Sequence, residues 1–198
     1  MPDETQRHAI VETARHLFVS KGYGATTTGE IAAACKISKQ TLYRLFPGKP
    51  ALFNEVISSM RDKWLNFPAD DTQPMDRALE DIFCAGISEE ANRERLELLR
   101  VVLAEGGRFP ELREAVHNCG REASRAALTG WLDKQRAKGL IKHCDTRRAA
   151  GMLMDMIFGA LTMKNVDSIE WPGNAEWFIH IRSCVSVFLH GVCSNEAG

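Results

Sequence analysis

Residues 26–53 read TTTGEIAAACKISKQTLYRLFPGKPALF, and this stretch decides the fold. It contains two short helical patterns, expected at residues 28–35 and 38–46. Each begins at a hydroxyl residue that can cap the unpaired N–H groups of a helix start. The apolar positions expected to face inward are Ile31, Ala34, Leu42, Leu45 and Phe46. Two short helices joined by a tight turn form a helix-turn-helix, whose second helix fits the major groove of DNA.

The charges of this stretch also suit a nucleic acid. Residues 31–54 contain no Asp or Glu. Their basic residues are Lys36, Lys39, Arg44 and Lys49. Because a duplex is a dense line of phosphates, an acid-free basic surface is what such a partner requires.

The charge of the whole chain is divided unevenly. The 198 residues have a net charge of −1, but residues 1–66 carry nine Lys and Arg against six Asp and Glu, a net +3. The rest carries 16 against 20, a net −4. This pattern predicts a basic DNA-binding head on a slightly acidic regulatory body.

Apolar residues recur with helical spacing along nearly the whole chain, and no strand pattern occurs. Outside the opening stretch, helices are expected at 3–21, 50–65, 75–91, 93–105, 110–138, 146–164 and 175–192. We therefore predict an all-α protein of about nine helices. A three-helix head at 1–50 is connected by helix four, to about residue 66, to a helical-bundle body at 67–198. The polar segment 66–74, with two prolines, is the expected boundary.

The last two expected helices are apolar over more than one stripe, so each needs two surfaces to pack against. One can be the core of the body and the other a second copy of the chain. Small residues would permit close helix approach. The interface residues predicted for a homodimer are Gly151, Phe158, Gly159, Ile181, Val185 and Phe188.

An ordered set of motifs resembles the N-terminal head of the TetR/AcrR family of transcriptional regulators over about residues 8–56. The matching residues are Gly22-Tyr23, Thr26-Thr27-Thr28, Glu30-Ile31-Ala32, Ile37-Ser38-Lys39, Thr41-Leu42-Tyr43, Phe46, Lys49 and Leu52-Phe53. Residues 98–112 (LLRVVLAEGGRFPEL) resemble the ligand-binding half of the AefR-like branch.

The resemblance implies which residues meet DNA. The recognition helix would be 38–44, with Lys39, Gln40 and Thr41 near base edges and backbone. Tyr43 and Lys49 would contact phosphate, and Thr28 would cap the first motif helix and touch the backbone. Gln can also read adenine in bidentate fashion. The full predicted set is Thr28, Lys36, Ser38, Lys39, Gln40, Thr41, Tyr43, Arg44 and Lys49.

Other interpretations of single residues stay open. Tyr43 could be an aromatic at the core edge, Lys39 a solvated charge, and Gln40 a residue without a base contact. The chain also departs from the family pattern at three positions. Lys36 stands where the turn usually has glycine, Leu45 where histidine is common, and Pro50 where a glutamate is common. The departures leave the motif intact and leave the operator sequence open.

The resemblance also implies an effector, because most relatives bind a small molecule in the helical body and lose DNA affinity when they do. The residues predicted to line such a pocket are Phe83, Leu99, Leu103, Trp131, Met152, Asp155, Met156 and Phe178. The same apolar pattern also fits a plain core. Asp155 could pair with a ligand cation, with Arg182 or across the dimer seam. Residues 93–105 and 66–74 are the expected coupling elements.

The remaining predictions concern function classes. Catalytic motifs such as G-x-S-x-G, H-E-x-x-H or a P-loop do not occur, so we expect no enzyme, cofactor or metal site. No signal peptide or membrane-length apolar run is visible, so we expect a cytoplasmic protein. The six cysteines suggest reduced thiols. Two alternatives to a repressor remain, a redox sensor acting through Cys35 and a transcriptional activator.

Overall fold

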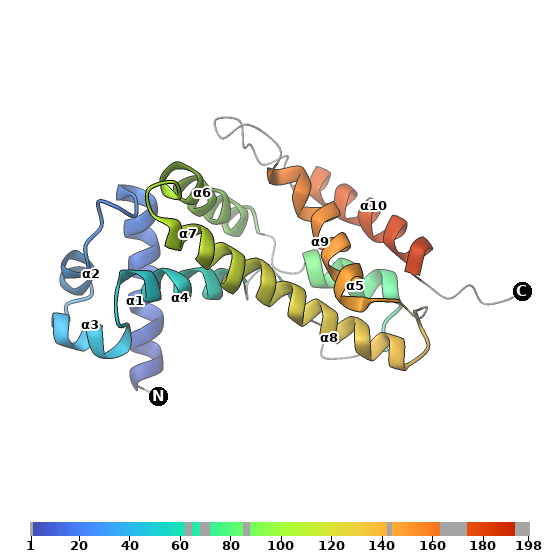
Figure 1. The fold of residues 1–198 in the computed structure, drawn as a ribbon, viewed down its shortest axis with the longest axis horizontal. Coiled ribbons are helices and arrows are strands. Elements are labelled where there is room, and N and C mark those ends of the chain that lie inside the picture. The colour runs from blue at the N-terminus through green and yellow to red at the C-terminus, as the bar shows by residue number, and fades with distance from the viewer. Residues whose placement is uncertain are drawn as a thin grey trace, which may run out of the picture. The chain divides into compact units, whose positions relative to one another are not determined.

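Helices form nearly all of the described structure (Figure 1). The computed structural model describes residues 2–61, 65–67, 72–84, 88–141, 144–162 and 174–192. The first four helices are α1 (Pro2–Lys21), α2 (Thr28–Ala34), α3 (Lys39–Leu45) and α4 (Lys49–Arg61). They are followed by α5 (Met75–Cys84), α6 (Glu89–Glu105), α7 (Pro110–Ala115), the π-helical segment η1 (Val116–Glu122), α8 (Ala123–Ala137), α9 (Thr146–Thr162) and α10 (Asn174–Val192). With α7, η1 and α8 counted as one rod, the described residues form nine helical rods, which confirms the all-α prediction.

Several helix boundaries differ from the expected ones. The first helix of the body ends at Cys84, and α6 begins at Glu89, so the break falls earlier than expected. The expected helix 110–138 has the right length, but a π-helical turn interrupts it at residues 116–122. A π-helical turn inserts an extra residue into the helical ladder, and apolar spacing alone does not reveal it. The expected boundary at 66–74 lies in part outside the described residues.

The chain divides into two compact units, whose bounds differ from those of the predicted domains at 1–50 and 67–198. The first contains residues 1–61 and 94–121, and the second contains residues 62–93 and 122–198. Most of α6 and all of α7 thus belong with the helix-turn-helix and not with the body. Polar contacts join α6 to the first helices, such as the 3.0 Å ion pair between Arg15 and Glu94, and Leu96, Leu98 and Val102 of α6 are buried. Arg15 is 4% exposed, so this pair is largely shielded from water.

The core of the first unit is a cluster of aromatic rings. Phe18, Tyr23 and Phe53 lie with ring centroids 5.3 to 5.6 Å apart, and Phe109 stands 5.3 Å from Tyr23. Tyr23 and Phe53 are fully buried. Ile31 is buried as expected, but Ala32 rather than Ala34 is its buried companion in α2, and Leu45 is only half-buried. The rings join α1, α4 and the loop before α7 into one core.

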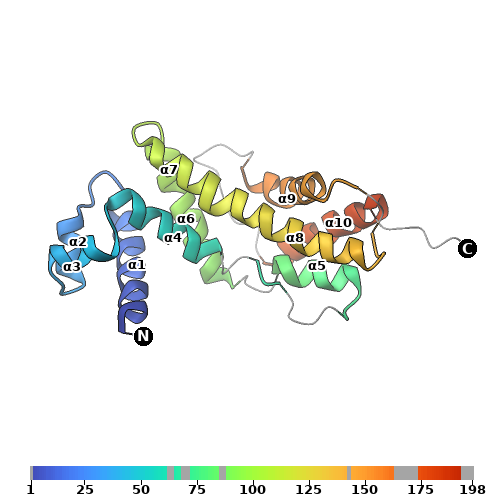
Figure 2. The same ribbon diagram turned by 60° about the horizontal axis from the view of Figure 1, so that its bottom comes forward.

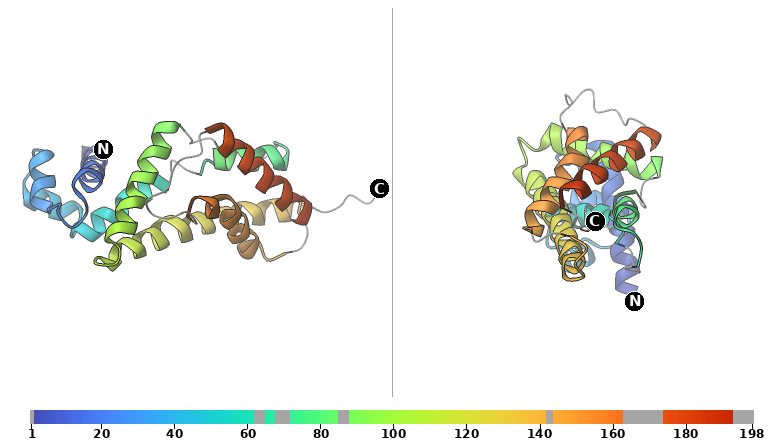
Figure 3. Two further views of the ribbon diagram at one scale, coloured as in Figure 1. Left: turned by 90° about the horizontal axis from the view of Figure 1, so that it is seen from above. Right: turned by 90° about the vertical axis from the view of Figure 1, so that its right-hand side faces the viewer.

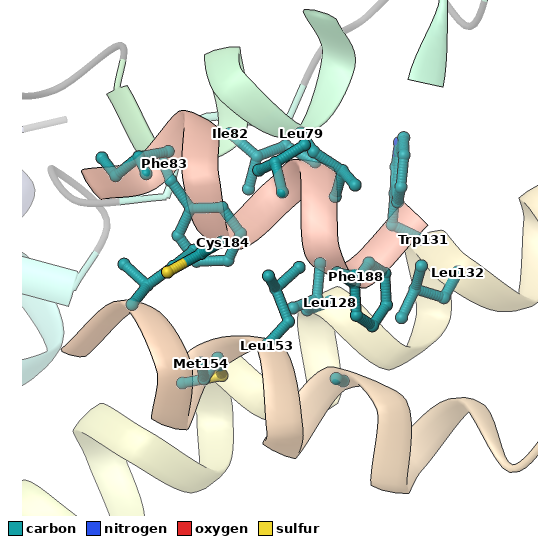
Figure 4. Close-up of a cluster of buried hydrophobic side chains, with 14 of the residues drawn as sticks. Leu79, Ile82, Phe83, Leu128, Trp131, Leu132, Leu153, Met154, Cys184 and Phe188 are labelled. Atoms are coloured by element: carbon teal, nitrogen blue, oxygen red, sulfur yellow. The ribbon is translucent and has the colours of Figure 1, made fainter. Parts of the chain in front are cut away.

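The second unit is built from α5, α8, α9 and α10, which lie together in each view (Figures 1, 2 and 3). Leucine, isoleucine and aromatic side chains from all four helices meet in its interior (Figure 4). Phe83 of α5 stacks edge-on with Phe158 of α9, which in turn packs against Trp177 of α10. His180 Nε2 donates to the carbonyl oxygens of Met156 and Ile157, at 3.1 and 3.2 Å, and so ties α10 to α9.

Part of the predicted dimer interface is wrong. Ile181, Val185 and Phe188 are 0%, 1% and 6% exposed and belong to the core of the second unit. Side chains already buried within one chain have no surface left for a second chain. Among the described side chains of α9 and α10, the large apolar ones that are exposed are Met152, Ile179 and Val187, at 67%, 59% and 65%.

Candidate nucleic-acid interface

The first helix of the motif is held by a reciprocal cap. Thr27, not Thr28, is its N-cap: its side chain accepts from the Glu30 amide at 3.2 Å, and Glu30 accepts from the Thr27 amide at 2.9 Å. The expectation for Thr28 was therefore one residue off. The signal for the correct residue was the Thr-x-x-Glu spacing of a capping box.

The Thr28 hydroxyl has a different partner. It lies 3.0 Å from the Tyr43 hydroxyl, and this hydrogen bond joins α2 to α3 across the motif. Tyr43 is 48% exposed, so its ring lies at the surface and not in the core. The bond holds the phenol of the recognition helix at a set place beside α2.

The turn between the two helices confirms the left-handed backbone conformation that was expected at Lys36. This residue has φ of 55°, and it is the non-glycine residue with positive φ among those described. A side chain in this left-handed conformation costs about 1 kcal/mol relative to glycine. The turn therefore carries an exposed positive charge at a small conformational cost.

The recognition helix α3 begins where expected. Ser38 is its N-cap and accepts from the Thr41 amide at 3.0 Å. Leu42 is 1% exposed and anchors the helix to the core, as predicted. Of the predicted DNA-binding residues, the exposed ones are Lys36, Ser38, Lys39, Gln40, Tyr43 and Arg44, and the half-buried ones are Thr28, Thr41 and Lys49. The α2–turn–α3 surface thus gathers all of these except Lys49.

Lys49 is placed differently from the others. Its ammonium group donates to the carbonyl oxygens of Tyr23 and Thr26, at 2.8 and 3.0 Å, and lies 4.2 Å from the centroid of the Tyr23 ring. Burial lowers the pKa of Lys49, while the carboxylates of Glu105 and Glu111 act in the opposite direction. Since an ammonium has three donors, two of them serve the fold, and the predicted phosphate contact stays a prediction.

Arg7 supports the helix-turn-helix, and this contact was not predicted from the sequence. It donates to the carbonyl oxygen of Leu45 at 2.9 Å, and its guanidinium lies 4.5 Å from the centroid of the Phe46 ring. A cation at a helix C-terminus is favourable because the last carbonyls carry partial negative charge. Arg7 thus fixes the C-terminal end of α3 from a position 38 residues earlier, and local sequence carries no sign of it.

The capping box makes the head sensitive to acid. The Lys21 ammonium and the Thr27 donors lower the pKa of Glu30 from 4.5 to about 2. Because the folded state binds this proton less readily than the unfolded state, the contribution of Glu30 is complete above pH 4.5 and is lost as the pH falls toward 2.

We expect Glu30→Gln to lower the denaturation midpoint of the head near neutral pH, with a gap from wild type that closes over that acidic range. Denaturation followed by circular dichroism at a series of pH values measures this gap. Glu114→Gln, at an exposed position of α7, is the control and should give a difference that does not depend on pH. A gap for Glu30→Gln that persists at acidic pH would contradict the role of its charge.

The predicted pocket residues do not gather in one place. Phe83 and Trp131 are buried in the core of the second unit, and Met156 and Phe178 are half-buried. Met152 is 67% exposed and Asp155 is exposed, so both lie on the outside of α9, which contradicts their prediction as pocket-lining residues. Arg182, one expected partner of Asp155, pairs with Glu80 at 3.2 Å.

Leu99 and Leu103 belong to the first unit and not to the body. Leu99 is half-buried there, and Leu103 is 41% exposed, so neither joins the cluster of the second unit. At these positions, the segment that resembles a ligand-binding half packs within the first unit.

The thiols and possible metal ligands bear on the other function classes. Cys35, Cys119 and Cys144 are half-buried free thiols, and Cys184 is a buried one. Burial raises the pKa of Cys184, which disfavours its reactive thiolate. Within the described residues no group of His, Cys, Asp or Glu is arranged to hold a metal ion. No helix in the same part of the chain is long and apolar enough to cross a membrane.

Comparison with known proteins assigns the class. Residues 10–56 match the family model for bacterial regulatory proteins of the tetR family. Residues 79–191 match the model for the C-terminal domain of AefR-like transcriptional repressors. The chain therefore belongs to the TetR family of transcriptional regulators, which bind DNA and are not enzymes.

Individual relatives agree with this assignment. The transcriptional regulator QacR of Staphylococcus aureus is 44% identical over 55 residues, which cover 28% of this chain and only 29% of QacR. The chain thus spans less than a third of the length of that relative. The regulator UidR of Escherichia coli is 25% identical over 186 residues, 92% of each chain.

Solved structures show the same fold over nearly the full length. A TetR-family regulator from Mesorhizobium loti is 27% identical, with a TM-score of 0.78. The match covers 98% of this chain and 100% of that regulator's chain. The flavonoid-responsive regulator FrrA is 25% identical with a TM-score of 0.72, over 97% and 99% of the two chains.

Proposed function

We propose that this protein is a ligand-responsive repressor that binds a palindromic operator as a homodimer and leaves it when a small apolar or amphipathic effector binds. The observation that carries the proposal is the exposed surface of the turn and α3. Lys36, Lys39 and Gln40 are exposed there on a segment without any acidic residue. Such a regulator acts on DNA in the cytoplasm.

The recognition helix offers two kinds of contact. Lys36 and Lys39 would meet phosphates, which contribute affinity at any sequence, while Gln40 would read a base edge, which contributes specificity. The Lys39 side chain lies close to Gly29, since a Cβ at that glycine would stand 2.9 Å from Lys39 Cε. The glycine therefore leaves room for the long side chain at the N-terminal end of α2.

The exposed apolar side chains of α9 and α10 support pairing of two chains. Met152, Ile179 and Val187 are each more than half exposed, and exposed apolar patches are typical of protein–protein contact sites. A second copy would cover them. Two recognition helices in such a dimer would reach half-sites about 34–36 Å apart, one turn of DNA.

The second unit supports an effector site. The indole N–H of Trp131 is buried and has no acceptor in the described part of the chain. A buried donor without an acceptor is costly, and a ligand with a hydrogen-bond acceptor would satisfy it. The name of FrrA states a response to flavonoids, and we propose an aromatic, oxygen-bearing effector of that general kind for this chain.

The DNA contacts are tested by affinity measured against salt concentration. The probe is a duplex selected by the wild-type protein from random-sequence DNA. We expect Lys36→Ala and Lys39→Ala each to make the slope of log K against log salt shallower by about one phosphate contact. Gln40→Ala should cost about 1–3 kcal/mol and relax the preference at one base position, with an unchanged slope.

Lys134→Ala, at an exposed site of α8, is the matched control and should leave affinity and slope unaltered. The proposal fails if the wild-type protein selects no duplex. It also fails if the two lysine variants keep the wild-type slope, because the basic surface would then not face phosphate.

A further inference from the structure

The last residue of α6, Glu105, carries a charge that its own helix disfavours. The C-terminus of a helix has partial negative charge, so a carboxylate there is unfavourable unless other groups compensate it. No basic residue occurs in the last turn of α6. The compensating groups therefore come from another part of the first unit.

Those groups are backbone amides of the loop between α1 and α2. The amide of Tyr23 donates to Glu105 Oε1 and that of Gly24 donates to Oε2, each at 2.7 Å. Two short hydrogen bonds from adjacent amides to one carboxylate form a bidentate, charge-assisted contact. The loop and the carboxylate are 82 and 81 residues apart in sequence.

Glycines allow this close approach. Gly22 has φ of 90°, and a Cβ there would stand 2.6 Å from Glu105 Oε1. A Cβ at Gly24 would stand 2.9 Å from Glu105 Oε2 and 2.8 Å from the Phe109 ring. A side chain at either position would displace the carboxylate or the ring, so the loop is shaped around Glu105.

Lys49 of α4 also binds this loop. Its ammonium group donates hydrogen bonds to the carbonyl oxygens of Tyr23 and Thr26. The buried Thr26 hydroxyl donates to the carbonyl oxygen of Gly22 at 2.8 Å. The loop thus has its amides bound by α6 and its carbonyls bound by α4, one residue before the Thr27 cap of α2.

We propose that Glu105 is a positioning residue for DNA recognition, which holds the loop before α2 so that α2 and α3 meet the operator in the correct orientation. This inference rests on the proposed operator binding and adds a residue outside the helix-turn-helix to it. Glu105 itself does not touch DNA in this proposal. It acts through the Tyr23–Gly24 amides and the start of α2.

The expected loss of affinity depends on the fraction of molecules whose loop is in the binding orientation. Without the carboxylate, the loop samples other conformations, and only the fraction in the binding orientation can bind DNA. The apparent dissociation constant rises by the inverse of that fraction. The number of phosphates contacted in the complex stays the same, so the salt slope is unchanged.

The test uses Glu105→Gln in the full chain, with the duplex selected by the wild-type protein as the probe. The glutamine side chain has one acceptor oxygen and an NH2 group in place of the second oxygen. One of the two hydrogen bonds from the loop amides is therefore lost, while the side chain keeps its size. We expect affinity about tenfold weaker than wild type, in line with the loss of one charge-assisted bond. The amide protons of Tyr23 and Gly24 should exchange faster in the free protein, and the salt slope should equal that of wild type.

Glu114→Gln is the matched control, because it removes the same charge from an exposed site of α7. Loss of a carboxylate near DNA should by itself strengthen binding, so weaker binding by Glu105→Gln alone separates positioning from net charge. Should Glu105→Gln fail to fold, Glu105→Asp keeps the charge but shortens the side chain, and it should also bind more weakly.

Affinity of Glu105→Gln equal to or higher than that of Glu114→Gln would overturn the inference and leave the operator proposal intact. A salt slope that differs from wild type would overturn it too, because the residue would then affect phosphate contacts. If the wild-type protein selects no duplex, the operator proposal falls and this inference falls with it.

Discussion

Phe53→Ala is expected to destabilise the first unit by about 3–5 kcal/mol, the usual range for a buried phenylalanine. Phe53 is fully buried, and its ring meets both Phe18 and Tyr23 at centroid distances of 5.6 and 5.3 Å. Removing it leaves a cavity in the middle of this cluster. Since the first unit includes most of α6 and all of α7, the loss should reach those helices and not only the helix-turn-helix.

Denaturant unfolding followed by circular dichroism measures the effect, and tryptophan emission provides an internal control. No tryptophan of the sequence falls within residues 1–61 or 94–121, so this emission follows the second unit. Leu103→Ala is the matched variant, because Leu103 lies in the same unit at 41% exposure and should cost less than about 1 kcal/mol. Equal losses for the two variants would show that the aromatic cluster is not the core of this unit.

Ile179→Glu combined with Val187→Glu is expected to convert the proposed dimer to a monomer and to weaken binding to a two-half-site duplex by about a hundredfold or more. The two side chains are 59% and 65% exposed, so the folded chain tolerates the charges. A dimer interface does not, because it would bury two unpaired carboxylates per chain. A monomer also loses the gain from binding two half-sites at once.

Sedimentation at several protein concentrations measures the assembly, and the same duplex measures the affinity. Ala127→Glu adds a charge at an exposed site of α8 and is the control for charge alone. A double variant that stays dimeric would place the interface elsewhere than the outer face of α10. Retained affinity in a monomeric variant would instead contradict paired recognition helices.

The local features of the head could be predicted because they depend on neighbouring residues. The Ser38 cap, the left-handed turn at Lys36, the buried Leu42 and the acid-free surface each arise within a few residues of sequence. The cap of α2 is also a local feature. The Thr27–Glu30 spacing of a capping box indicates Thr27 as the cap, and the prediction of Thr28 was wrong.

The wrong predictions for residues of α9 and α10 have a different cause. An apolar stripe shows that a helix face is buried but not which surface buries it. Ile181 and Val185 were therefore assigned to a second chain, whereas they pack within their own. Met152 and Asp155 were assigned to a pocket, whereas α9 turns them outward.

The helical class, the helix-turn-helix with its basic surface and the family can be inferred from the sequence, because caps, turns and periodic apolar faces are encoded locally. Which segments pack with the helix-turn-helix is seen only in the folded chain. The contacts of Glu105 with Tyr23 and Gly24, of Arg7 with Leu45, and of Arg15 with Glu94 join residues from 38 to 82 positions apart. Such pairs leave no local pattern, since each partner is an ordinary residue until folding brings the two together.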